Sequence, residues 1–157
     1  MDHPSSPFTV LMVDDNEHDL LAAERAWKRG QMPSELKTVT SGEECLAYLR
    51  HEGAYRDRAI APFPKVLVLD ISMPGMSGLE VLEEIRADPT LALLPVVMLT
   101  TSQLEEDRVR SYQLGCNAYL RKPVTFDDFA EMIRRLHLFW EIVDVPQPFG
   151  QASADLA

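Results

Sequence analysis

The feature that most constrains the fold is a regular alternation of short apolar runs with longer segments of helical pattern. The apolar runs are rich in β-branched residues, which favours strands buried on both faces of a parallel sheet. The three clearest runs are 8–13 (FTVLMV), 65–71 (KVLVLDI) and 96–100 (VVMLT). Weaker strands are predicted at 36–40 (LKTVT) and 118–120 (AYL), nearer the edges of the sheet.

Start and stop signals place a helix after each predicted strand. Asn16 can cap the first helix, which is expected to stop at Gly30. Later helices open with capping-box residues or their acidic variant, in the pairs Ser41 with Glu44, Ser77 with Glu80, and Thr125 with Asp128. The third helix is expected to end before Asp88-Pro89, and a fourth to run over 104–114. Five strand-helix units joined by right-handed crossovers predict one parallel sheet with helices on both faces.

Length, charge and cysteine content narrow the function classes. The chain has 157 residues, enough for one domain to fold without a disulfide or metal. Its 25 acidic and 15 basic residues give a net charge of -10, which argues against a nucleic-acid surface or an anionic membrane as partner. Cys45 and Cys116 have no metal-ligand neighbours and are expected to be buried, reduced thiols. Without a signal-peptide pattern or an apolar stretch of about 18 residues, a cytoplasmic protein is expected.

Polar side chains follow four of the five predicted strands. Asp14 and Asp15 follow the first strand, Asp70 the third, Thr100 the fourth and Lys122 the fifth. Alone, each residue has an ordinary role as a helix start, a turn former, a strand residue or a solvated charge. Together they stand where an open parallel sheet binds ligands, at the carboxyl ends of its strands.

These residue types suit a metal-assisted phosphoryl site. Three neighbouring carboxylates need a compensating cation, and oxygen ligands with open water positions favour Mg²⁺. Asp15 is expected to hold the metal directly and Asp14 at least partly through water. Asp70 follows a buried central strand and is the best candidate to attack phosphorus and form an acyl phosphate. Thr100 can donate a hydrogen bond to the phosphoryl group, and Lys122 can pair with it as a compact positive charge.

In four segments the sequence resembles the receiver domain of bacterial response regulators. In chain order these are VLMVDDNEHD, VLVLDISMPGMSGLEVL, VVMLTTS and AYLRKP, and the resemblance covers about 8–139. It implies a doubly wound (βα)₅ flavodoxin-like α/β fold, with a parallel five-stranded sheet in the order 2-1-3-4-5. It also implies Mg²⁺ and phosphotransfer from a histidine kinase to Asp70.

The same resemblance assigns further roles. The backbone carbonyl of Ser72 would bind the metal, and Thr100 and Tyr119 would be switch residues that reorient after phosphorylation. The Lys122–Pro123 bond would be cis. Two features depart from the common pattern: the connection over 51–64 is longer than usual, and Thr101 stands where alanine is common.

Three function classes remain to be compared. The favoured one is a phosphorylatable switch that turns over no external substrate and is not an enzyme in the ordinary sense. A phosphohydrolase of the haloacid-dehalogenase type would carry DxD after the first strand, where this chain has Asp14-Asp15. A pseudo-receiver that only docks partners would have an eroded acid site.

The layout predicts a receiver domain over 8–140 and a C-terminal extension over 141–157, with no output domain. The signal is then expected to leave by binding another protein, which the sequence does not identify. The long connection before the third strand and the FW-containing extension also resemble single-domain regulators of phytochrome-type histidine kinases.

The last helix is predicted to mediate a homodimer. One apolar stripe is expected to face the sheet, made by Phe126, Phe129, Ile133, Leu136, Trp140 and Val143. Leu138, Phe139 and Ile142 add apolar surface outside that stripe, more than one sheet face can cover. Such a patch is typical of an interface, so the helix and the extension are expected to contact a second copy. The alternative is that the segment after 145 folds back over the patch.

Overall fold

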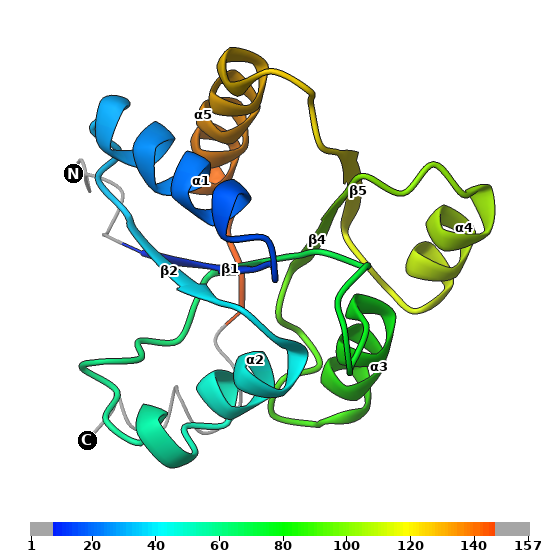
Figure 1. Cartoon of the computed structure of the whole chain (residues 1–157). Helices are drawn as coiled ribbons and strands as arrows, with labels where there is room; N and C mark the ends of the chain where they lie inside the picture. The colour runs from blue at the N-terminus through cyan, green and yellow to red at the C-terminus, as the bar shows by residue number, and fades with distance from the viewer. Residues whose placement is uncertain (1–7, 147–157) are drawn as a thin grey trace.

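A five-stranded parallel sheet in the order β2-β1-β3-β4-β5 forms the centre of the computed structural model, which describes residues 8–146 (Figure 1). The strands are β1 (Thr9–Val13), β2 (Glu35–Val39), β3 (Val66–Leu69), β4 (Val96–Thr100) and β5 (Ala118–Arg121). The predicted α/β fold and its strand order are confirmed. Most of the C-terminal extension predicted over 141–157 lies outside the described residues.

Helices follow the strands as the start and stop signals predict. They are α1 (Glu17–Arg29), α2 (Gly42–Leu49), α3 (Gly78–Ala87), α4 (Glu105–Gln113) and α5 (Phe126–Ile142), with a 3₁₀ turn, η1 (Gly53–Tyr55). Helices α1 and α5 cover one face of the sheet, α2 and α3 cover the other, and α4 lies beside β5 (Figure 1). Among the described helices, none has the length and apolar character needed to cross a membrane.

The predicted caps are formed, but of the three predicted capping boxes only one is complete. Ser77 and Glu80 make a complete capping box. Ser41 accepts a hydrogen bond from the Glu44 N–H as predicted, but the Glu44 carboxylate accepts from the N–H of Thr40 instead of Ser41. The box at α2 is therefore half formed, because the returning carboxylate reaches one residue further back.

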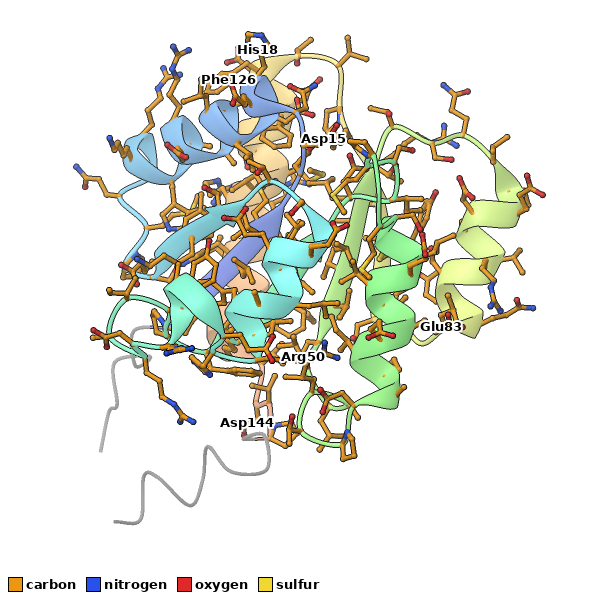
Figure 2. The ribbon with its side chains drawn as sticks, turned by 60° about the horizontal axis from the view of Figure 1, so that its bottom comes forward. Asp15, His18, Arg50, Glu83, Phe126 and Asp144 are labelled. Atoms are coloured by element: carbon orange, nitrogen blue, oxygen red, sulfur yellow. The ribbon has the colours of Figure 1, made fainter. Side chains whose placement is uncertain are left out.

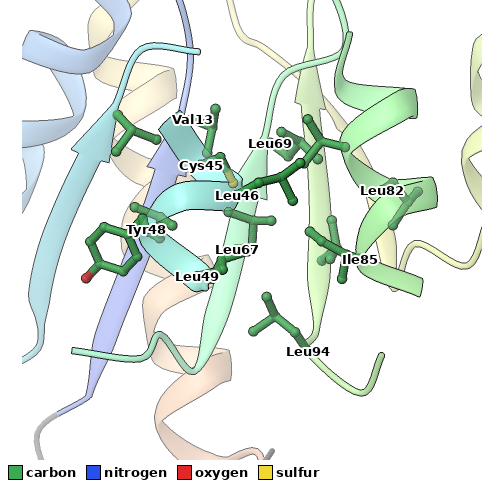
Figure 3. Close-up of a cluster of buried hydrophobic side chains, with 14 of the residues drawn as sticks. Val13, Cys45, Leu46, Tyr48, Leu49, Leu67, Leu69, Leu82, Ile85 and Leu94 are labelled. Carbon is green, nitrogen blue, oxygen red and sulfur yellow. The ribbon is translucent and has the colours of Figure 1, made fainter. Parts of the chain in front are cut away.

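Two apolar clusters hold the helices against the sheet. The cluster under α2 and α3 includes Val13, Leu46, Leu67, Leu82 and Ile85, and Figure 3 shows these side chains meeting between the helices and the strands. The cluster under α1 and α5 includes Met12, Ala23, Val68, Ile133 and Trp140. Neighbouring residues of one strand thus enter opposite clusters, as expected for strands covered on both faces.

Both cysteines are buried free thiols, as predicted. Cys45 lies in the cluster under α2 and α3, where burial raises the pKa of its thiol. Cys116 lies in the same cluster, and burial is the main reason why the pKa of its thiol is raised as well.

The long connection over 51–64 folds back onto α2. The Tyr48 hydroxyl donates a hydrogen bond to the Pro62 carbonyl at 2.8 Å, and His51 Nε2 lies 3.0 Å from the Ala61 carbonyl oxygen. The Tyr55 hydroxyl donates to the Glu44 carboxylate. This segment is therefore anchored by polar contacts to the helix that precedes it.

The two faces of α5 differ as the sequence predicts. Phe129, Ile133 and Trp140 are buried against the sheet. On the outer face, Leu138, Phe139 and Ile142 are 47%, 55% and 82% exposed. The end of α5 thus carries an apolar patch among the described residues.

Candidate functional site

Backbone hydrogen bonds at the carboxyl ends of the strands bring the predicted site residues together. The Asp70 N–H donates to the Val13 carbonyl at 3.1 Å, which places Asp70 beside Asp14. The Lys122 N–H donates to the Thr100 carbonyl at 2.9 Å, which fixes the end of β5 against the end of β4. The parallel ladder therefore continues for one residue past the strands and sets the backbone of the site.

Three carboxylates meet at this edge of the sheet. Ligand oxygens of Asp14, Asp15 and Asp70 all lie within 4.8 Å of one another. Asp14 and Asp70 are buried, whereas Asp15 is exposed in the turn between β1 and α1 (Figure 2). Hard oxygen donors with one side open to water fit Mg²⁺, which usually keeps several of its water ligands.

The turn after Asp70 wraps around its carboxylate. The Ser72 N–H donates to Asp70 Oδ1 at 3.4 Å. This contact keeps the Ser72 backbone close to the acid cluster. The role of the Ser72 carbonyl as a metal ligand stays a prediction.

The Lys122 ammonium lies among these acids. Its Nζ is 2.6 Å from Asp14 Oδ2 and 3.3 Å from Asp70 Oδ2, and the Lys122 side chain is only 7% exposed. Burial by itself lowers the pKa of Lys122, but hydrogen bonds to Asp14 and Asp19 and the charge of Asp70 outweigh it and raise the pKa. Lys122 is therefore a permanent cation at neutral pH.

At Asp14, unlike at Lys122, the effect of burial on the pKa outweighs the effect of the hydrogen bonds. Burial raises the pKa of Asp14, although Lys122 and the Asn16 N–H, which donates to Asp14 Oδ1 at 2.9 Å, act against this shift. A buried carboxylate of this kind is stabilised by any further cation that reaches it. The chain thus presents an acid cluster with one internal cation and excess negative charge.

The predicted cis Lys122–Pro123 bond is wrong. Residues 8–146 contain no cis peptide bond, so this bond is trans. The Lys122 side chain reaches Asp14 and Asp70 from a trans backbone, which is the ordinary state of X-Pro bonds.

The two predicted switch residues lie on neighbouring strands. Thr100 ends β4, is fully buried, and its Oγ1 accepts a hydrogen bond from the Ser102 N–H at 3.1 Å. Tyr119 pairs with Met98 in the register of β4 and β5, and its half-buried ring packs against the cluster under α2 and α3. Burial is the main cause of a raised pKa at Tyr119.

One site residue was missed by the sequence analysis. Asp19 Oδ2 lies 2.8 Å from Lys122 Nζ, so a fourth carboxylate belongs to the site. Asp19 stands in the first turn of α1, three residues after the cap Asn16. The sequence shows only that Asp19 stands near the start of a helix. Acids are common there because they stabilise the helix start, so this position does not indicate a site residue.

Comparison with known proteins agrees with this architecture. Residues 10–134 match the response regulator receiver domain family. The response regulator Rcp1 of Synechocystis sp. is 34% identical over 146 residues, which cover 92% of this chain and 97% of Rcp1.

Solved structures show the same likeness. The structure of the phosphorylated cyanobacterial phytochrome response regulator RcpA is 36% identical, with a TM-score of 0.82 over 90% of this chain and 100% of RcpA. The Mn²⁺-bound form of Rcp1 is 35% identical, with a TM-score of 0.80 over 89% of this chain and 99% of Rcp1. Together with the five-stranded fold and its edge of acids, these likenesses show that the chain belongs to the response regulator receiver domain family.

Proposed function

We propose that the chain is a phosphorylation switch in which Asp70 accepts a phosphoryl group from a histidine kinase. The observation that carries this proposal is the position of the Asp70 carboxylate, next to both the acid cluster and the Lys122 ammonium. An Asp70 carboxylate oxygen attacks phosphorus and the P–N bond of phosphohistidine breaks. The imidazole nitrogen keeps the electron pair and takes up a proton, and an acyl phosphate forms on Asp70.

The surrounding groups supply positive charge where the transferred group needs it. Asp14, Asp15 and Asp70, with the Ser72 carbonyl, would hold Mg²⁺. A bound divalent ion would neutralise the acids and stabilise the phosphoryl oxygens. The Mn²⁺-bound form of Rcp1 supports a divalent ion in this family. Lys122 offers a second cation.

The phosphoryl group is then sensed by Thr100 and Tyr119. The buried Thr100 hydroxyl accepts from Ser102 and keeps its own proton to donate to a phosphoryl oxygen. Tyr119 lines a hollow beside α4, together with Val109 and Tyr112. Helix α4 buries only Ser111 of its nine residues, so few contacts oppose its movement. The proposed output is a changed face made by α4, β5 and α5.

Partners and compartment follow from the same proposal. A phytochrome-type histidine kinase is favoured, because RcpA is a phytochrome response regulator. We assign the receiver to 8–140 and the extension to 141–157, and the signal leaves by binding another protein, not nucleic acid. Two buried free thiols support the reducing cytoplasm as the compartment.

We also propose a homodimer through the end of α5 and the extension. Leu138, Phe139 and Ile142 form the apolar patch described above. A second copy presents the same patch, which suits a twofold interface in which identical surfaces meet.

The phosphorylation proposal is tested with acetyl phosphate and Mg²⁺, followed by mass measurement of the intact chain. We expect one added phosphoryl group in the wild type and in Asp57→Asn, a matched change of an exposed acid. Asp70→Asn is expected to keep the fold and lose the label. Undiminished labelling of Asp70→Asn at another residue contradicts the assignment.

The same assay separates the other function classes. Lasting addition of one group, without turnover of an external substrate, supports the switch. Continuous release of phosphate without a detectable adduct supports a phosphohydrolase. An unchanged mass supports a receiver that only docks partners.

A further inference from the structure

Lys122 has one carboxylate partner that is not part of the acid triad. An ammonium has three N–H donors. In the described part of the chain, they face Asp14 Oδ2 at 2.6 Å, Asp19 Oδ2 at 2.8 Å and Asp70 Oδ2 at 3.3 Å. Asp14 and Asp70 belong to the triad with Asp15, whereas Asp19 does not. A divalent ion that draws on the triad thus leaves the contact between Asp19 and Lys122 available.

The position of Asp19 is set by the start of α1. Its backbone N–H donates to Asn16 Oδ1 at 3.3 Å and to the Asn16 carbonyl at 3.1 Å. The Asp19 side chain is 31% exposed, against 1% for Asp14. Asp19 therefore holds Lys122 from the solvent side of the site, on the first turn of a capped helix.

A role at the helix start does not account for this contact. Glu17 is also an acid in the first turn of α1, where its negative charge interacts favourably with the helix dipole as that of Asp19 does. Glu17 is exposed to solvent, and it is not among the carboxylates that pair with Lys122. The two acids thus share the helical role and differ in the lysine contact, which makes Glu17 a matched control.

The Lys122 ammonium lies closer to Asp19 than to Asp70, at 2.8 Å against 3.3 Å, so the Asp19 carboxylate draws it away from the side chain that would carry the phosphoryl group. We propose that Asp19 is a positioning residue that holds Lys122 in the unphosphorylated chain and thereby weakens its pairing with the phosphoryl group. This inference rests on the proposed phosphorylation of Asp70 and deepens it. Asp19 then sets how favourable the phosphorylated state is, without touching the phosphoryl group.

The test measures the affinity of the full chain for beryllofluoride in Mg²⁺, a stable substitute for a phosphoryl group on a carboxylate. By fluorine NMR, Asp19→Asn is expected to bind about two- to fivefold more tightly than wild type, the size expected for loss of a partly exposed ion pair. Glu17→Gln removes the same charge from the same helical turn and is expected to stay at the wild-type affinity. Asp19→Glu keeps a carboxylate and is expected to restore it.

A second measurement follows Lys122 itself. The nitrogen-15 signal of its ammonium is expected to be sharp in the ligand-free wild type and broadened in Asp19→Asn, because one of its three anionic partners is lost. An unchanged signal, an affinity equal to or weaker than wild type, or an equal gain in Glu17→Gln overturns the role of Asp19. A wild type that binds no beryllofluoride overturns the proposed phosphorylation of Asp70, and this inference with it.

Discussion

A Cβ atom on Gly78 would lie 2.1 Å from the backbone carbonyl oxygen of Asp70. The first residue of α3 therefore lies directly against the proposed phosphoacceptor. The Gly78 N–H also donates to the Ile71 carbonyl at 2.9 Å, which closes the turn between β3 and α3. Because this turn carries Ser72 past the Asp70 carboxylate, the absence of a side chain at Gly78 is part of the geometry of the site.

We expect Gly78→Ala to displace the Asp70 backbone. The overlap involves rigid backbone atoms, so the expected loss in the free energy of unfolding is about 1–3 kcal/mol, the usual range for overpacking. Urea denaturation measures this loss, and acetyl phosphate labelling is expected to fall at least about tenfold, as misplaced reacting groups typically cause. In the control Gly30→Ala, the nearest atoms to the new Cβ are the flexible end of Met32 at 3.1 Å and the Ala26 carbonyl oxygen at 3.2 Å, so a smaller loss of stability and wild-type labelling are expected. Wild-type stability and labelling of Gly78→Ala would contradict the argument.

Lys122→Gln is expected to destabilise the metal-free chain. The change leaves the buried Asp14 and Asp70 carboxylates without a cation, which typically costs about 3–5 kcal/mol. Urea denaturation in a chelator at pH 7 measures the loss, and Lys28→Gln on the exposed side of α1 is the control. Mg²⁺ is expected to stabilise Lys122→Gln more than the wild type, since the ion then provides the missing charge. If Mg²⁺ stabilises Lys122→Gln and the wild type equally, the ion does not replace the charge of Lys122 at the acid cluster.

His137 is expected to make stability fall in mild acid. The side chain is buried on α5, where it contacts the Ser34 hydroxyl and stacks on Phe8 with ring centroids 5.4 Å apart. Burial lowers the pKa of His137, and Glu141 at 3.2 Å opposes this only in part. As the pH falls below about 6.5, the unfolded chain takes up the proton first, so the free energy of unfolding decreases.

The measurement is the free energy of unfolding between pH 7 and pH 5. His137→Gln is expected to flatten the decrease, whereas the exposed His18→Gln is expected to keep the wild-type slope. An unchanged slope in His137→Gln would mean that other groups cause the pH dependence.

The end of α5 is expected to hold two copies together. Light scattering at micromolar concentration should give the mass of two chains for the wild type and of one chain for Phe139→Glu and Ile142→Glu. Leu21→Glu, an equally exposed position on α1 at 56%, is the control and should remain a dimer. Trp140 is unsuitable for this test because it is buried. A wild-type mass of one chain, with and without phosphorylation, would end the hypothesis.

Local signals in the sequence were sufficient to predict the order of the elements and which acids lie together at the edge of the sheet. The ends of the strands match the predicted ends within two residues, and the cap at Asn16 and the box from Ser77 to Glu80 are formed. These features depend on contacts between residues three or four positions apart, which the sequence displays directly. Asp14 and Asp70 could also be placed together, since residues that follow neighbouring parallel strands emerge at one edge of the sheet.

Only the tertiary structure decided which polar groups touch. Asp19 and Lys122 are 103 positions apart, and their contact depends on the rotation of α1 about its axis and on the reach of the lysine side chain. The tertiary structure also decided that the Lys122–Pro123 bond is trans, and the lysine side chain reaches the acids from this backbone. His137 is buried because Ser34 supplies a polar partner from another part of the chain. Periodicity determines which face of a helix is apolar, whereas the pairing of single polar groups depends on distances that form only when the elements pack.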